Sequence, residues 1–494
     1  MLKMKKIYTI ITVLFLSLSL TSCLNEWLTV NPKTDMTRDN MFSTESGFKD
    51  ALTGVYIQLK SSAGYGQRLT YTTIEHLVTS WDVTSASTEQ RLNQFLYTDA
   101  GVESAMDAIF SQQYKVISSI NAILDQIDSK KEIFLTEGLY ELIKGEALAL
   151  RALCHLDILR LFGPVPTVTT ANPILPYVKT LSRDAVSHIN FAAFKTELLK
   201  DMNDAEQLLM VADPVLNFSM TEMRRPGAIY PFNPTDTYFA FRHIRMNYFA
   251  VKALKARTYL WFGDNVNAFA NAKEVIDAKN TDGSSKFTLG TSADMTAGNL
   301  NLPSEHIFGI YEFSLLTSYN NMFANGNLKK GSAETTIKSQ LYGNTGTDIR
   351  ETYLWELITQ ANQAKTYIIK KYKVIDNPTS MLVDYRQIPL LRIAEMYLIA
   401  TEAAPTLTEA QAYWNTFRTA RNITTSALSS DPVMLKDEVM KEYRKEFYAE
   451  GQAFYNYKRL DMPKSKILYA STSATVVLNY VVPLPKSELI NINK

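Results

Sequence analysis

Cysteine and histidine are scarce in this chain, and its charges nearly cancel. Two cysteines among 494 residues cannot build the disulfide framework of a small secreted domain. The five histidines form no HExxH or HxxH pair, so the sequence predicts no local metal site. With 51 basic and 50 acidic residues the net charge is +1, which argues against nucleic acid as a partner.

The short motifs of common catalytic classes are also missing. The sequence has no GxSxG elbow, no GxxxxGK[ST] phosphate loop, and no GxGxxG after an expected strand. We therefore expect a protein that is not an enzyme and that needs no cofactor or metal. One alternative stays open, a hydrolase whose catalytic carboxylates come from distant parts of the chain.

Long apolar runs are absent apart from one near the start. The run 7–20 follows three lysines, and its roughly 14 residues are too few to span a bilayer about 30 Å thick, as is typical of a secretory signal. It ends in Leu20-Thr21-Ser22-Cys23, which resembles the bacterial lipobox, where the cysteine thiol is acylated. We expect residues 1–22 to be a lipoprotein signal peptide and Cys23 to carry the lipid that tethers the chain to a membrane.

The remaining composition is that of a globular protein, with 46% hydrophobic and 20% charged residues. Apolar residues recur at i, i+3, i+4 and i+7 in several segments, which indicates amphipathic helices and a mostly α fold. Asp431-Pro432 supplies a capping residue and a first-turn proline for the last of them. The expected helices span 48–60, 105–127, 138–162, 191–210, 242–262, 266–278, 390–404, 409–421 and 432–459.

One segment resembles a tetratricopeptide unit, a pair of antiparallel helices. Within 242–278 the helices meet at Gly263-Asp264, and Ala256, Tyr259 and Ala268 stand where small and aromatic residues let paired helices approach. A single unit cannot bury its own face, so other pairs should stack on it. We expect an all-α scaffold of tetratricopeptide-like helical pairs, with further pairs at 105–162 and 390–421.

Long irregular segments separate these helices, at 163–190, 213–237 and 280–348. Loops well beyond about 15 residues are uncommon in a compact domain unless they bind something. No low-complexity tract or clean linker divides the chain. We therefore expect residues 23–494 to form one domain whose insertions bind the ligand.

Several short strings in this chain resemble, in order, the signature of the SusD/RagB family of outer-membrane lipoproteins. No single string is specific, but their order extends over nearly the whole mature chain. They are Gly145-Glu146-Ala147, Arg151-Ala152, Asp157, Arg160, Gly163, Val165-Pro166, Asp201-Met202, Asp348-Ile349-Arg350, Pro389-Leu390-Leu391-Arg392, Ala394-Glu395, Glu402-Ala403, Glu442, Glu446, Glu450-Gly451 and Pro483-Leu484-Pro485.

This resemblance implies a surface-exposed, lipid-anchored protein of the outer membrane that captures oligosaccharide or polysaccharide. It also implies delivery of this glycan ligand to a SusC-like, TonB-dependent transporter. The RagB branch of the family suggests peptide as an alternative ligand, which a charged groove in place of an aromatic platform would favour. A structural partner of the transporter with no ligand of its own is a third possibility.

Sugar recognition needs flat aromatic faces with amide, hydroxyl or carboxylate groups beside them. Several rings lie in polar or irregular segments where exposure is expected, although each ring taken singly has core packing as its alternative. Trp261 and Trp414 lie in strong helical patterns and are assigned to packing. The candidate ligand-binding residues are Trp81 and Asp82 in the polar stretch 79–90, Tyr65 between two glycines, Tyr319, Tyr353 and Trp355.

Charged residues in the helices are interpreted as structural. Glu442, Glu446 and Glu450 recur every four residues on one helix face, and we expect a network that ties this helix to the scaffold, or a solvated face, in preference to catalysis. Glu146 with Arg151 and Asp157 with Arg160 are likewise expected to be structural pairs.

Overall fold

The structure is a computed structural model that describes residues 37–168, 171–182, 184–224, 231–360, 364–374 and 386–492. Cys23 and the expected signal peptide lie outside these ranges. Across the described ranges, no helix combines the length and the apolar character that a membrane crossing requires. Cys154 is buried, as expected for a small apolar residue.

Helices make up most of the structure, and each expected helix is represented, although some differ at their ends and one is divided in two. They are α2 (Arg38–Met41), α3 (Glu45–Leu59), α4 (Thr73–His76), α5 (Thr88–Asn93), α6 (Ala100–Ile127), α7 (Leu139–Phe162), α8 (Phe191–Ala212), α9 (Met220–Arg224), α10 (Tyr248–Trp261), α11 (Asn265–Asp277), α12 (Ser292–Thr296), α13 (Leu315–Tyr319), α14 (Ile349–Leu354), α15 (Ile393–Ala403), α16 (Leu407–Ala420), α17 (Pro432–Glu446), α18 (Gln452–Arg459) and α19 (Lys486–Ile492).

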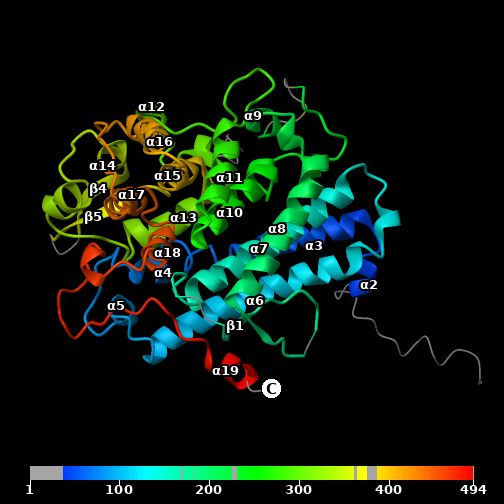
Figure 1. Cartoon of the computed structure of the whole chain (residues 1–494), viewed down its shortest axis with the longest axis horizontal. Helices are drawn as coiled ribbons and strands as arrows, with labels where there is room; N and C mark the ends of the chain where they lie inside the picture. Colours follow the sequence, from blue (N-terminus) through cyan, green and yellow to red (C-terminus); the bar gives the residue numbers. More distant parts are fainter. Residues whose placement is uncertain are drawn as a thin grey trace, which may run out of the picture.

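The long helices stack in pairs, which confirms the all-α, tetratricopeptide-like scaffold. Helix α7 packs against both α6 and α8, α10 against α11, α11 against α15, and α15 against α16. In Figure 1, α3, α6, α7 and α8 lie together on one side, α10 and α11 lie in the middle, and α14 to α18 lie on the other side. The insertions surround this scaffold.

Sequence explains where these helices begin and how closely they pack. Asp99 begins α6 by accepting hydrogen bonds from the backbone N–H groups of Gly101 and Val102, and Asp431 caps α17 as expected. A Cβ on Gly145 of α7 would lie 2.8 Å from Leu209 Cγ of α8. Only glycine permits this close approach of the two helices.

Short antiparallel strand pairs connect the helical layers. They are β1 (Pro173–Pro176) with β2 (His188–Asn190), β3 (His306–Tyr311) with β6 (Gln387–Arg392), and β4 (Trp355–Thr359) with β5 (Lys365–Ile369). The expected helix 390–404 therefore begins only at Ile393. Its first residues are instead a strand that is buried on both faces, where periodicity does not separate strand from helix.

The expected helix 432–459 is also interrupted. Helix α17 ends at Glu446, and α18 starts at Gln452 after Ala449 and Gly451 adopt positive φ of 65° and 73°. At Gly451 an added Cβ would lie 2.2 Å from Leu69 O, so close contact with another segment fixes the break. The expected helix 242–262 is shorter at its start, because residues Arg242–Ile244 form a 3-10 turn and α10 begins only at Tyr248.

Buried apolar side chains form two clusters. The larger runs through the helical pairs, from Phe42 in the first described segment to Val482 near the end. The smaller, which we call the insertion core, comes mainly from residues 295–374, including Phe323 and Trp355, and is joined by Tyr71, Trp81 and Tyr448. The third insertion is thus packed around a core rich in aromatic rings, whereas the first two pack on the larger cluster.

Buried ion pairs hold distant segments together. As expected, Glu442, Glu446 and Glu450 form a network, and Glu446 alone accepts hydrogen bonds from Arg350, Arg392 and Arg421 at 2.8–3.1 Å. This network joins α17 to α14, to β6 and to the end of α16, so it is structural.

The pairing of Asp157 with Arg160 on α7 is confirmed. The expected pairing of Glu146 with Arg151 is wrong. Glu146 binds Arg242, and Arg151 binds Asp201 of α8 at 2.7 Å. Sequence spacing suggested a partner within one helix, whereas both partners come from neighbouring elements.

Candidate functional site

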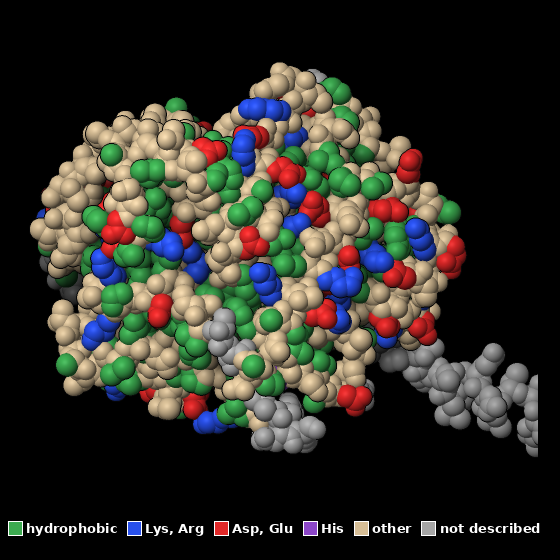
Figure 2. All heavy atoms as spheres, in the orientation of Figure 1, with side chains coloured by type: hydrophobic (Ala, Val, Ile, Leu, Met, Phe, Trp, Pro, Cys, Tyr) green, Lys and Arg blue, Asp and Glu red, His purple; other side chains and the backbone are tan. Residues whose placement is uncertain are grey.

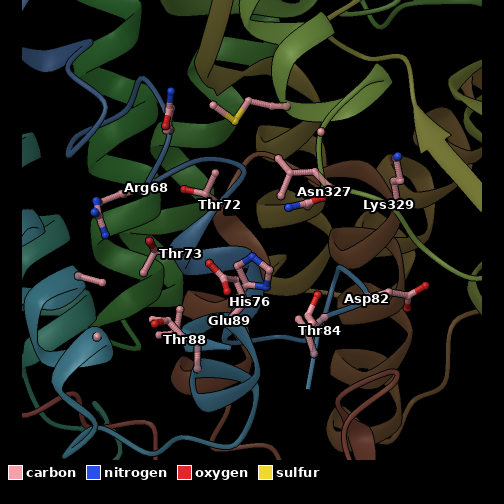
Figure 3. A pocket seen from close by; sticks show the side chains of 18 of the residues that line it. Arg68, Thr72, Thr73, His76, Asp82, Thr84, Thr88, Glu89, Asn327 and Lys329 are labelled. Carbon is pink, nitrogen blue, oxygen red and sulfur yellow. The ribbon is translucent and has the colours of Figure 1, made fainter. Parts of the chain in front are cut away.

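A polar pocket of about 810 Å³ lies mainly between residues 62–105, which include the start of α6, and residues 321–329 of the third insertion. Figure 3 shows side chains from separate segments facing this hollow. Among the described residues that line it there is no Trp, Tyr or Phe. The lining residues are Ser62, Gln67, Arg68, Thr72, Thr73, His76, Asp82, Val83, Thr84, Thr88, Glu89, Leu92, Gly101, Ser104, Ala105, Asn321, Met322, Gly326, Asn327, Leu328, Lys329, Gln360 and Thr366.

Tight packing fixes one wall of the pocket. Helix α5 is capped by Ser87, whose hydroxyl accepts a hydrogen bond from Gln90 N at 3.1 Å. A Cβ on Gly101, at the start of α6, would lie 2.3 Å from Thr88 Oγ1. The first turns of α5 and α6 therefore touch, and only a glycine fits between them.

Asp82 fixes the opposite wall. Its backbone N–H donates to Lys329 O at 2.9 Å, and its carboxylate accepts a hydrogen bond from Gly331 N at 2.6 Å. Lys330 Nζ lies 3.4 Å from the same carboxylate and donates to Thr79 O at 2.9 Å. Burial lowers the pKa of Lys330, and Asp82 opposes this shift. These contacts attach the 326–331 loop to the stretch 79–90.

Arg68 is one of the charged residues that line the pocket. It is half-buried, and its guanidinium has no carboxylate partner among the residues that the structure describes. Burial lowers its pKa, with no acidic neighbour acting against that shift. Lys329, across the pocket in Figure 3, reaches Gln360 Oε1 at 3.5 Å.

His76 lies at the bottom of the pocket between these two cations (Figure 3). It is only 5% exposed, and the Asn93 side chain lies within hydrogen-bonding reach of its ring. Burial lowers its pKa to about 4, although the nearby Glu89 carboxylate and Asn93 raise it. The imidazole is therefore neutral at pH 7.

The candidate rings Trp81 and Tyr65 were expected to be exposed, and this expectation is wrong. Trp81 is 1% exposed, donates to Tyr71 O at 2.8 Å, and packs edge-on against Tyr448 in the insertion core. Tyr65 is 3% exposed and donates to Asp157 Oδ2 at 2.6 Å. The polar group of each ring donates to a buried acceptor, and this hydrogen bond allows the whole side chain to be buried.

Tyr319 and Trp355 are also buried, at 3% and 6% exposure. Tyr319 stacks on Phe323, and Trp355 begins β4 instead of continuing a helix. Tyr353 is half-buried, and its hydroxyl accepts a hydrogen bond from Thr296 Oγ1 at 3.1 Å. Of the candidate residues only Asp82 lines the pocket, with its side chain 56% exposed.

The segments that carry the candidates nevertheless meet at the pocket. Gln67 and Arg68 follow Tyr65 closely, residues 82–89 follow Trp81, and Asn321 follows Tyr319. The rings point into the cores, and their polar neighbours point into the cavity. Sequence analysis missed Arg68, His76 and Lys329, and no spacing in the sequence marks them, because they meet only through tertiary structure.

A second hollow of about 630 Å³ lies near the ends of α10 and α18. Trp261, expected to be a packing residue, forms part of its wall together with Leu260, Phe262 and Met462. Most of its lining comes from the scaffold, and Pro166 and Thr167 of the first insertion complete it. Figure 2 shows basic and acidic side chains interspersed over the face in view, without a large area of one sign. The described residues contain no cluster of three or more potential metal ligands.

Comparison with known proteins gives two family matches. A sequence model described as starch-binding and associating with the outer membrane, SusD-like, matches residues 26–216. The model of the SusD family, SusD_RagB, matches residues 257–489. The SusD-like protein P25 of Formosa agariphila is 28% identical over 184 residues, which are 36% of this chain. That match spans only 34% of the length of this relative.

Solved structures share the fold. A SusD superfamily protein from Bacteroides vulgatus matches with a TM-score of 0.66 at 20% identity, covering 91% of this chain and 98% of that one. One from Bacteroides thetaiotaomicron has a TM-score of 0.64 at 20% identity, with 90% and 98% covered. A laminarin-binding SusD-like protein has a TM-score of 0.61 at 16% identity, with 91% and 98% covered.

Proposed function

Because this chain belongs to the SusD/RagB family, we propose that it captures oligosaccharide or polysaccharide at the outer membrane and delivers it to a SusC-like, TonB-dependent transporter. The lipid on Cys23 holds it at the cell surface, and residues 23–494 act as one domain. The polar pocket between residues 62–105 and the third insertion is the observation that carries this proposal.

The size and lining of the pocket suit a short stretch of glycan. A volume of about 810 Å³ lies within the usual range of roughly 300–1,000 Å³ for ligand sites. Amides from Gln67, Asn321, Asn327 and Gln360 both donate and accept hydrogen bonds, and threonine and serine hydroxyls lie between them. A ligand rich in hydroxyl groups can satisfy this lining.

Peptide capture is the second candidate, and one observation favours it. The pocket has no aromatic lining among its described residues and carries Arg68, Glu89 and Lys329, which is the charged groove expected of a peptide site. The mixed charges match the backbone termini and side chains of a short peptide. Glycan remains the main proposal because a laminarin-binding protein is among the structures with this fold and a family model is described as starch-binding.

Family members are binding proteins, and we assign this chain no catalytic step. His76 and Glu89 lie close together, which a hydrolase would also require of an acid and a base. Incubation of the protein with each ligand that it binds, followed by chromatography, tests this assignment. Shortened products in the wild type that are missing from Glu89→Gln would make the protein a hydrolase.

The proposed function is tested by calorimetry of the purified protein against a panel of oligosaccharides and protein digests. The variant Gln67→Ala/Asn327→Ala removes two amides from the pocket, and Gln207→Ala, exposed on α8 and outside the pocket lining, is the matched control. A hydrogen bond contributes about 1 kcal/mol, so we expect roughly tenfold weaker glycan binding in the double variant and no change in the control. Binding of peptides alone would replace the glycan proposal.

The anchor is tested separately. Cells expressing the wild type and Cys23→Ser are labelled with a clickable fatty acid, and membranes are then fractionated. Lipid label in the outer-membrane fraction that disappears in Cys23→Ser supports the anchor, and co-purification of a TonB-dependent transporter from the same membranes supports the partner. Equal labelling of the two proteins would refute Cys23 as the acylated residue.

A further inference from the structure

We propose that the glycan bound in this pocket is anionic, and that Arg68 pairs with its carboxylate or sulfate group. This inference deepens the proposed function and rests on it. It names the class of sugar, an acidic one, and the side chain that selects it.

Arg68 is the main ground for this inference. A guanidinium carries five N–H donors and keeps its charge in proteins, so its burial without a counter-ion is costly. Here the side chain is half-buried against the pocket wall, and no carboxylate pairs with it in the described residues. An anionic group on the ligand supplies the missing partner, with the paired geometry that arginine forms with carboxylate or sulfate.

The other charges of the pocket leave a positive excess. Asp82 is already bound by Lys330 and by the N–H of Gly331, so it does not neutralise the cavity. Lys329 has a weak contact with an amide and no acidic partner in the described chain. Glu89 is exposed to solvent beside His76, and it offsets only one of the two free cations.

The absence of aromatic lining agrees with this assignment. Neutral sugars gain much of their binding from stacking of C–H faces on rings, which the described lining of this pocket does not provide. An acidic sugar gains charge-assisted hydrogen bonds in place of stacking, and these are roughly twice as strong as neutral ones.

Matched pairs of ligands test this inference on the full-length protein in detergent. Oligogalacturonate is compared with its methyl ester, and a sulfated galactan oligosaccharide with its desulfated form, by calorimetry at low and at high salt. We expect an acidic form to bind at least roughly tenfold tighter than its neutral counterpart, with the difference shrinking at high salt. Binding of oligogalacturonate identifies a carboxylate as the recognised group, and binding of the sulfated galactan identifies a sulfate.

Variants separate Arg68 from general charge effects. Arg68→Gln should weaken acidic-glycan binding roughly tenfold to hundredfold and leave neutral-glycan binding unchanged, since it removes a charge-assisted bond. Lys200→Gln, on the exposed face of α8, removes the same charge outside the pocket and should have no effect. Far-UV circular dichroism of each variant checks that it is folded.

The failures are distinguishable. If neutral glycans bind as tightly as acidic ones, or if Arg68→Gln binds acidic glycan like the wild type, this inference is wrong and the proposed function stands. If no glycan binds while acidic peptides bind through Arg68, both the glycan function and this inference are overturned.

Discussion

Replacing Glu446 by glutamine tests whether the buried network holds the C-terminal helices to the scaffold. Glu446 is 2% exposed, and its two oxygens accept four hydrogen bonds from three arginines. Glutamine keeps the shape but removes the charge and turns an N–H₂ group towards those guanidinium donors. Breaking a buried ion pair costs about 3–5 kcal/mol, so we expect a loss of that size in the free energy of unfolding.

Urea unfolding at pH 7, followed by far-UV circular dichroism, measures this loss. Glu438→Gln on the same helix is the matched control, because this carboxylate is 45% exposed and pairs only with Lys441, so about 0–0.5 kcal/mol is expected. A loss in Glu446→Gln that stays within about 1 kcal/mol of the control would refute the reasoning, since the arginines would then need no shared acceptor.

The pH dependence gives a second readout of the same network. Burial raises the pKa of Glu446, but Arg421, Arg392 and Arg350 outweigh it and hold that pKa well below its usual value. A depressed folded pKa stabilises the protein above the unfolded value of about 4.3, and this stabilisation is lost as the pH falls below it. The wild type should lose stability on acidification from pH 5 to 3, and Glu446→Gln should lose less.

Other predictions concern two buried residues, Glu75 and Trp81, and the break between α17 and α18. Burial raises the pKa of Glu75 to about 7, so its protonated carboxyl stabilises the folded state at pH 4, and this stabilisation is lost as the pH rises through 7. The free energy of unfolding, measured in urea, should therefore fall between pH 5 and pH 8, and Glu75→Gln should remove up to about 3 kcal/mol of this fall. Trp81→Ala should lower the free energy of unfolding by about 3–5 kcal/mol with or without ligand, and an unchanged Tm would contradict its burial. Gly451→Ala, at positive φ and with its new Cβ 2.2 Å from Leu69 O, should cost roughly 1–3 kcal/mol or more by thermal unfolding.

Periodicity predicted the scaffold well because buried helices leave a pattern in the sequence itself. The small residues Ala256 and Ala268 indicated a helical pair, and both are fully buried between α10 and α11. The same reasoning failed at Leu390, because a strand buried on both faces has no alternating pattern. It failed again at Ala449 and Gly451, where a contact with the distant Leu69 interrupts the helix.

The candidate site was predicted by segment but not by side chain. Polar composition correctly marked the stretch 79–90 as part of the pocket, since Asp82 and Glu89 line it. Composition did not show that Trp81 turns the other way, into rings supplied by Phe323 and Tyr448. Which side of a loop is buried depends on what packs beneath it, and those residues lie hundreds of positions away.

The aromatic rings under the pocket also bear on the order of folding. Tyr448 packs between Trp81 and Trp355, with ring centroids 5.2 Å and 4.9 Å away, and its hydroxyl donates to Ser80 O, 368 positions earlier. Contacts between such distant segments require a large loop to close, so they form slowly and late. Every residue that lines the pocket precedes Tyr448 in the chain, yet Trp81, which directly precedes the lining residue Asp82, is packed only after Tyr448 docks. Assembly of the binding site should therefore be among the last steps of folding, after the helical pairs have formed.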